Sequence, residues 1–288
     1  MRNELQNQEA LEAYVCALTL ERKRRLINNI DTELNRLKGI STQVFRKFEG
    51  RLQLVGSAFY LTYQGRLFLI SAAHVFDDEP VNRRLIFDEK GDLRTVEGRM
   101  YKHVAPGRRD DDLKDLIAIE LRNIDTRREL NTSINIANPD EDGIYAFMGY
   151  PGTKNGFIYR SRALKNRPYA YYDRSLRARD VTSFAYDDAL NILIRYQRKK
   201  SVLKGLGPQH GPKMKGISGG PVFWITPMQD LADWTPDSIK LAGVVIHTVD
   251  AQKYMAAAKI GILSEVIDGV SKFQPEFECI EIVNADDT

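Results

Sequence analysis

Hydrophobic and polar positions change their spacing near residue 44. Before it, apolar residues recur every three or four positions, and Gly39 stands where a helix commonly ends. The apolar positions are Leu11, Tyr14, Val15, Leu18, Leu26, Ile27, Ile30, Leu34 and Leu37. The pattern predicts two helices, or one helix kinked near residues 19–24. Such an extension either packs as a layer on the body of the protein or docks a partner or a second copy of the chain.

From about Val44 onward, short apolar runs separated by turn residues replace the helical spacing. The runs 52–63 and 66–76 flank Gln64-Gly65 and predict a hairpin, and LIFD and LRTVEG around residues 89–92 predict another. Further strands are predicted at 116–121, 143–150, 191–196, 221–225 and 240–247. Regular short strands favour antiparallel barrels or a sandwich over a parallel sheet. A helical segment at 262–273 precedes an acidic tail.

Composition narrows the class of protein only a little. The 288 residues hold 42 Lys and Arg against 39 Asp and Glu, and a net charge of +3 by itself implies neither nucleic acid nor a membrane surface as partner. Only Cys16 and Cys279 could form a disulfide, no apolar leader begins the chain, and no window resembles a membrane span. We therefore expect a cytoplasmic protein with no metal, cofactor or membrane partner.

A serine lies among three glycines in Lys215-Gly216-Ile217-Ser218-Gly219-Gly220-Pro221. G-x-S-G-G-P should occur by chance roughly 0.0003 times in a chain of this length. A serine hydroxyl attacks a carbonyl only when a base accepts its proton and donors stabilise the oxyanion. A sharp turn at Ser218 would direct the amides of Gly216 and Ser218 at one point, so these two residues are the candidate oxyanion hole.

A base and a carboxylate can be chosen from few candidates. His74 follows an apolar run and two alanines, and the other histidines are His103, His210 and His247. Asp115 begins the apolar run 116–121, whereas Asp110, Asp111 and Asp112 lie in a charged run expected to be solvated. A buried carboxylate that orients the histidine completes a nucleophile, base and acid set, here Ser218, His74 and Asp115.

These residues resemble the chymotrypsin-like (trypsin-like) serine endopeptidases, especially the intracellular bacterial type. The matching stretches are Ser71-Ala72-Ala73-His74, Asp115-Leu116-Ile117-Ala118-Ile119-Glu120-Leu121, Gly216-Ile217-Ser218-Gly219-Gly220-Pro221 and Val55-Gly56-Ser57-Ala58-Phe59. They occur in the order His, Asp, Ser that this family has. The resemblance covers about residues 46–270.

The resemblance implies a fold and a reaction. The fold is two packed antiparallel six-stranded β-barrels, with the helical extension at 1–45, the first barrel at 46–135, the second barrel and its C-terminal helix at 136–275, and the tail at 276–288. The reaction is hydrolysis of a peptide bond through an acyl-enzyme on Ser218. A protease fold that only binds or scaffolds partners is the alternative, and the complete set of three residues speaks against it.

Three positions depart from secreted trypsins. Ile217 replaces the aspartate that pairs with a newly cut N-terminus, so activation by N-terminal insertion is not expected. Control by a partner or by allostery is expected instead. Pro212 replaces the aspartate that selects basic side chains, so cleavage after Lys or Arg is not expected. His247 lies near the segment that lines the substrate pocket; it either reads an acidic or amide side chain there or lies on the surface.

Residues 154–204 hold 13 Lys or Arg and four Asp, with tyrosines between them. The stretch is either a set of solvated hairpin loops or a docking surface for an acidic substrate, a protein partner or, least favoured, a nucleic acid. The expected partner of the whole chain is a protein or peptide substrate. A regulatory protein that binds the N-terminal helices is a further expectation.

Overall fold

A computed structural model gives the structure of the chain and describes most of residues 24–269. The described residues are 21, 24–77, 84–87, 92–103, 112–122, 130–131, 136–137, 143–153, 155–158, 163–165, 167–181, 186–196, 202–203, 207–208, 211–225, 235, 238–249 and 254–269. Among them, no helix has both the length and the apolar character that crossing a bilayer requires.

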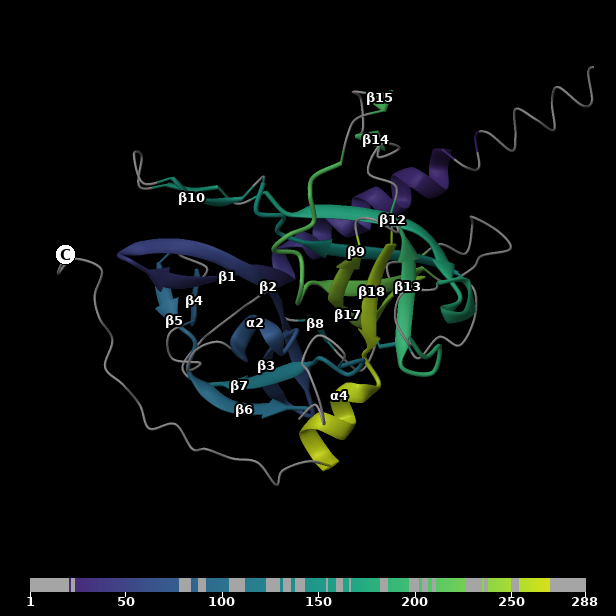
Figure 1. The fold of residues 1–288 in the computed structure, drawn as a ribbon. Helices are drawn as coiled ribbons and strands as arrows, with labels where there is room; N and C mark the ends of the chain where they lie inside the picture. The colour runs from purple at the N-terminus through teal and green to yellow at the C-terminus, as the bar shows by residue number, and fades with distance from the viewer. Residues whose placement is uncertain are drawn as a thin grey trace, which may run out of the picture.

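The first half of the chain forms one sheet of eight strands, at the lower left of Figure 1. The strands are β1 (Ser41–Phe48), β2 (Arg51–Tyr63), β3 (Arg66–Ser71), β4 (Arg84–Phe87), β5 (Leu93–Thr95), β6 (Gly98–Lys102), β7 (Ile117–Leu121) and β8 (Leu130–Asn131). Their order is β5-β4-β1-β2-β3-β7-β6, all antiparallel, and β8 pairs with β2 in parallel. The sheet is therefore a half-barrel of eight strands, where six in a closed barrel were expected.

The β2–β3 hairpin confirms the prediction made from Gln64-Gly65. Tyr63 pairs with Arg66, and φ is +51° at Gln64 and +73° at Gly65, as a two-residue type I′ turn requires. Strand β3 ends at Ser71, however, so the prediction of a strand through residue 76 was wrong. The chain instead turns into the one-turn helix α2 (His74–Asp77).

The second half forms a closed six-stranded antiparallel barrel, as predicted. Its strands are β9 (Ile144–Gly149), β12 (Tyr169–Leu176), β13 (Asn191–Arg195), β16 (Pro221–Ile225), β17 (Ile239–Val249) and β18 (Tyr254–Lys259), in the order β12-β13-β18-β17-β16-β9. Two small hairpins, β10 (Gly156–Ile158) with β11 (Ala163–Lys165) and β14 (Val202–Leu203) with β15 (Gly207–Pro208), extend from it (Figure 1).

The barrel strands are buried on both faces, which explains their continuous apolar runs. Along β9, Ala146 and Met148 belong to the apolar cluster shared with the first sheet, while Tyr145 and Phe147 belong to a second cluster. Because successive side chains of a strand point to opposite faces, both faces need apolar residues.

Strand β18 was not predicted. Its sequence, Tyr-Met-Ala-Ala-Ala-Lys, has three alanines, which favour helix over strand. All six of its residues are buried between β13 and β17. Small side chains fit this crowded position, so tertiary packing overrides the local preference.

Helical residues 24–37, purple in Figure 1, form a packed layer on the barrels. Ile30, Leu34 and Leu37 are buried in the cluster that also holds residues of both sheets. The apolar positions 11–18 lie outside the described residues. At the other end, helix α4 (Ile262–Ser264) continues into a π-helical turn, Glu265–Gly269, and lies below the barrels.

Candidate active site

Helix α2 fixes the position of His74. The amides of Val75 and Phe76 donate to Ala72 and Ala73 and close the turn, and both side chains are buried. The fully buried Arg84 donates its Nε–H to the Val75 carbonyl at 2.8 Å. The imidazole of His74 is left 34% exposed, which suits a side chain that must meet a substrate.

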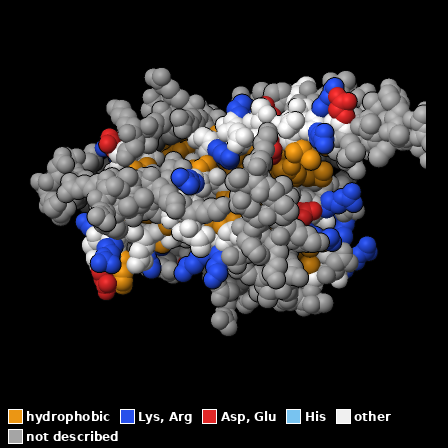
Figure 2. Space-filling model, turned by 90° about the horizontal axis from the view of Figure 1, so that it is seen from above, with side chains coloured by type: hydrophobic (Ala, Val, Ile, Leu, Met, Phe, Trp, Pro, Cys, Tyr) orange, Lys and Arg blue, Asp and Glu red, His pale blue; other side chains and the backbone are white. Residues whose placement is uncertain are grey.

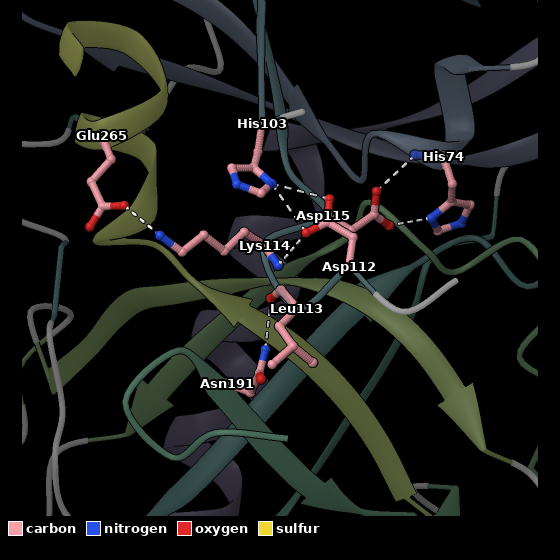
Figure 3. A network of polar contacts seen from close by, with 8 residues as sticks. All are labelled: His74, His103, Asp112, Leu113, Lys114, Asp115, Asn191 and Glu265. Atoms are coloured by element: carbon pink, nitrogen blue, oxygen red, sulfur yellow. Dashed lines mark hydrogen bonds and ion pairs between the residues drawn. The ribbon is translucent and has the colours of Figure 1, made fainter. Parts of the chain in front are cut away.

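The carboxylate of Asp115 is fully buried and points at His74 (Figure 3). One oxygen accepts the His74 backbone N–H at 3.0 Å, and the other lies 2.5 Å from the ring Nδ1. A neutral imidazole that donates through Nδ1 presents Nε2 as a proton acceptor. The pair is therefore arranged as an oriented general base.

A polar network holds the turn that carries Asp115, as Figure 3 shows. The Asp112 carboxylate accepts the Lys114 amide at 3.0 Å and pairs with His103 Nδ1 at 3.1 Å. The Leu113 carbonyl accepts the side-chain N–H of Asn191, at the start of β13, at 2.9 Å. Contacts from both barrels thus hold the turn that carries Asp115.

Asp112 corrects a prediction from the sequence. Its run was expected to be solvated, but only 5% of Asp112 is exposed, because its carboxylate caps the turn and pairs with His103. Asp110, Asp111 and His210 lie outside the described residues.

Ser218 lies in the turn that leads into β16. The amides of Ile217, Gly219 and Gly220 donate to main-chain carbonyls at 2.8–3.0 Å. In the described part of the chain, the amides of Gly216 and Ser218 have no such acceptor. Gly216 has φ of +93°, a conformation that L-residues rarely adopt. These two amides are those expected to face an oxyanion.

The serine turn packs directly against the segments that lead to His74. A Cβ on Gly219 would lie 2.0 Å from the Ser57 carbonyl oxygen and 2.1 Å from Ser71 Oγ, so only glycine fits. The Ser57 amide donates to the Ser218 carbonyl at 2.8 Å. Within the described residues, the Ser218 hydroxyl makes no hydrogen bond to the His74 ring; such contacts often tighten only when substrate binds.

Ser57 connects the two barrels, and its role was not predicted. It is fully buried, its hydroxyl donates to the Gly216 carbonyl at 2.8 Å, and it accepts the Tyr150 amide at 2.9 Å. Its own carbonyl accepts the Ser71 hydroxyl at 2.8 Å. A polar residue inside the apolar strand 52–63 was the available signal, because buried hydroxyls are hydrogen-bonded.

No protein-family model and no curated protein matches the sequence. Solved structures do match. Human heparin binding protein aligns with 85% of this chain and 96% of its own, at 12% identity and a TM-score of 0.51. The scabies mite inactivated protease paralogue S-I1 aligns with 83% and 98%, at 14% identity and 0.52. The chain has the two-barrel fold of the chymotrypsin-like serine proteases.

The secreted serine protease VesC of Vibrio cholerae has the same fold. It aligns with 79% of this chain at 13% identity and a TM-score of 0.51. The chain spans only 45% of the length of VesC. At identities this low, the structural alignments establish the chymotrypsin-like fold alone. Activity has to be argued from the site.

Two departures from secreted trypsins have structural consequences in this chymotrypsin-like fold. Ile217 is fully buried in the same apolar cluster as Phe147 and Val222, so its side chain cannot offer a partner to a charged N-terminus. Pro212 is buried, and its carbonyl accepts the Tyr196 hydroxyl at 2.8 Å, which ties this segment to the end of β13.

His247 lies beside the candidate base. Its half-buried ring is parallel to that of His74, at an interplanar angle of 4° and with ring centroids 6.3 Å apart. Strand β17 has a bulge at this point, between Val245 and His247. A role of His247 in substrate contact stays a prediction. Among the described residues, no group of three or more His, Cys, Asp or Glu side chains could hold a metal ion.

Proposed function

We propose that the protein is a serine endopeptidase in which Ser218 is the nucleophile, His74 the general base and Asp115 the orienting acid. The observation that carries the proposal is the buried Asp115 carboxylate, which binds both the backbone and the ring of His74. An isolated buried carboxylate is costly, so one that bonds both the backbone N–H and the ring Nδ1 of the same histidine indicates a function for that histidine.

The proposed reaction follows from these positions. Ser218 Oγ attacks the peptide carbonyl while His74 Nε2 takes the hydroxyl proton, and the amides of Gly216 and Ser218 bind the oxyanion. His74 then gives that proton to the leaving amine, and an acyl-enzyme remains on Ser218. Water attacks the ester with His74 again as base, which releases the carboxylic acid and regenerates the hydroxyl.

Control of the activity should differ from that of secreted trypsins. The buried Ile217 offers no carboxylate to an N-terminal amine, so the turn must be set by other contacts. The Ser57 hydroxyl bonds to the Gly216 carbonyl of this turn, and helical residues 24–37 pack into the core that both sheets share. A partner that binds the helical extension is the proposed regulator.

A second candidate is a protein of protease fold that binds partners without hydrolysis. Two observations favour it: Ser218 and His74 share no hydrogen bond in the described structure, and proteins of this fold include inactivated protease paralogues of the scabies mite. Heparin binding protein shows by its name that a binding role also occurs on this fold.

Hydrolysis of an unfolded, fluorescently labelled protein, together with labelling by a fluorophosphonate, separates the two candidates. An endopeptidase should cleave the protein and bind the probe, and Ser218→Ala should do neither. A wild type that neither cleaves nor binds the probe, with or without a lysate fraction as a source of partners, would favour the silent binding protein.

A further inference from the structure

Two long stretches of the second barrel contain no acidic residue. Residues 143–172 hold five Lys or Arg, and residues 189–225 hold seven, with no Asp or Glu in either. At the average frequency of the chain, about nine acidic residues would be expected there. A solvated surface commonly mixes both signs, so this asymmetry needs an explanation.

The two stretches meet at the serine turn. The Gly152 amide donates to the Lys215 carbonyl at 2.8 Å, and a Cβ on Gly216 would lie 3.3 Å from the Gly152 nitrogen. Lys213 and Lys215 are both exposed, five and three positions before the proposed nucleophile. Their charges therefore lie at the edge of the proposed active site.

Arg167 extends this edge. The Asn155 side chain accepts the Arg167 amide at 2.7 Å and donates to the carbonyls of Arg167 and Pro151, both at 3.0 Å. Since Pro151 precedes the Gly152 contact, exposed Arg167 belongs to the same surface as Lys215. We call Lys213, Lys215 and Arg167 the basic rim.

The cations of the basic rim are available to a ligand. In the part of the chain that the structure describes, none of the three takes part in an ion pair, although acidic side chains elsewhere are paired with Lys102, Lys114 and Arg66. Figure 2, the view from above onto the side that carries β12, shows Lys and Arg spread over the described surface and few Asp or Glu.

Aromatic side chains decide between classes of anionic ligand. Single-stranded nucleic acid is held by bases that stack on exposed rings. On the second barrel, Tyr169 and Tyr196 are buried, and half-buried Tyr171 packs edge-on against Tyr196 with centroids 5.0 Å apart. The exposed large apolar residues of the described chain are Ile27, Phe48 and Ile136, none on the rim. Carboxylates on an extended peptide need only the cations.

We propose that the basic rim binds acidic side chains of a polypeptide substrate and so selects acidic segments for attack at Ser218. The substrate class rests on the proposed function, whereas binding at the rim does not. Each carboxylate that the rim attracts would bring a neighbouring peptide bond toward the serine turn.

Binding is tested on Ser218→Ala, which removes hydrolysis from the measurement. The probes are a fluorescent, unstructured peptide rich in glutamate and the same peptide with glutamine at every glutamate position. The test variant adds Lys213→Gln and Lys215→Gln. The matched control adds Arg122→Gln. Exposed Arg122 follows the end of β7 that lies far from Asp115, and the five residues of β7 between them span roughly 17 Å.

Fluorescence anisotropy should show tighter binding of the glutamate peptide than of the glutamine peptide, weakened by salt. The double lysine variant should bind the glutamate peptide about twofold to thirtyfold more weakly, and the Arg122 control should bind it as before. Equal binding of the two peptides, or equal loss in the control, would overturn the proposal.

Two further arms keep this result separate from the proposed function. Heparin or single-stranded DNA that binds while the glutamate peptide does not would also overturn it, in favour of a polyanion site. Rim-dependent peptide binding supports it whether or not the wild type cleaves the peptide, and failure of cleavage counts against the endopeptidase alone.

Discussion

Gly219→Ala tests the contact that joins the serine turn to the first barrel. Gly219 has φ of +87°, where an alanine costs about 1–2 kcal/mol. Its Cβ would lie 2.0 Å from the Ser57 carbonyl and 2.1 Å from Ser71 Oγ. Real Cβ contacts are at least 3.0 Å, so the turn must move by about 1 Å, with an overpacking cost of about 1–3 kcal/mol more.

The same movement should slow the chemistry. A displacement of about 1 Å at a reacting group can lower a rate about 100-fold. The second-order rate of fluorophosphonate labelling measures the nucleophile directly, and urea unfolding measures the loss of stability. We expect labelling at least about 100-fold slower and an unfolding free energy about 2–5 kcal/mol lower.

Gly65→Ala is the matched control. Gly65 also has a positive φ, +73°, but nothing lies within 4 Å of an added Cβ. Its substitution should cost about 1–2 kcal/mol and leave the labelling rate unchanged. Gly219→Ala with wild-type stability and wild-type labelling, or equal effects of both substitutions, would refute the argument from close packing.

Three other variants test separate parts of the account. Asp115→Asn should keep the fold, by circular dichroism, and lower the labelling rate about 10⁴-fold, because the histidine loses its orienting carboxylate; a loss below about tenfold would contradict the role. Ser57→Ala leaves the part-buried Gly216 carbonyl and the buried Tyr150 amide unpaired, so urea unfolding should show a loss of about 1–3 kcal/mol, and an unchanged midpoint would contradict it. Burial raises the pKa of Tyr172 to about 12, so the stability that its neutral form contributes is present below about pH 10 and is lost as the pH rises through 12. The thermal midpoint should therefore fall less from pH 9 to pH 12 in Tyr172→Phe than in the wild type, and an equal fall would count against the raised pKa.

Features that depend on a few neighbouring residues, such as tight turns, were predictable from the sequence. Gln64-Gly65 sets a two-residue turn, because both positions must adopt positive φ, and the hairpin followed. The glycines around Ser218 indicated a tight turn, and the structure shows positive φ at Gly216 and Gly219. The fold class was predicted from these short motifs, without overall sequence similarity to a known family.

Features that arise from contacts between distant segments were not predictable. Asp112 lies in a charged run, and its burial depends on the turn that it caps and on its pairing with His103. Nothing in the local sequence of Asn191 indicates its bond to Leu113 across the two barrels. Strand β18 forms because β13 and β17 pair with it on its two sides, which its own sequence does not indicate. The cytoplasmic location and the expected absence of cleavage after Lys or Arg stay predictions.

The central claim is that His74 and Asp115 activate Ser218. Peptide mapping after fluorophosphonate treatment tests it most directly, with the labelling rate of His74→Gln measured beside that of the wild type. The account predicts one adduct, on Ser218, formed at least about 10³-fold more slowly in the variant. An adduct on another serine, or an equal rate in His74→Gln, would contradict it.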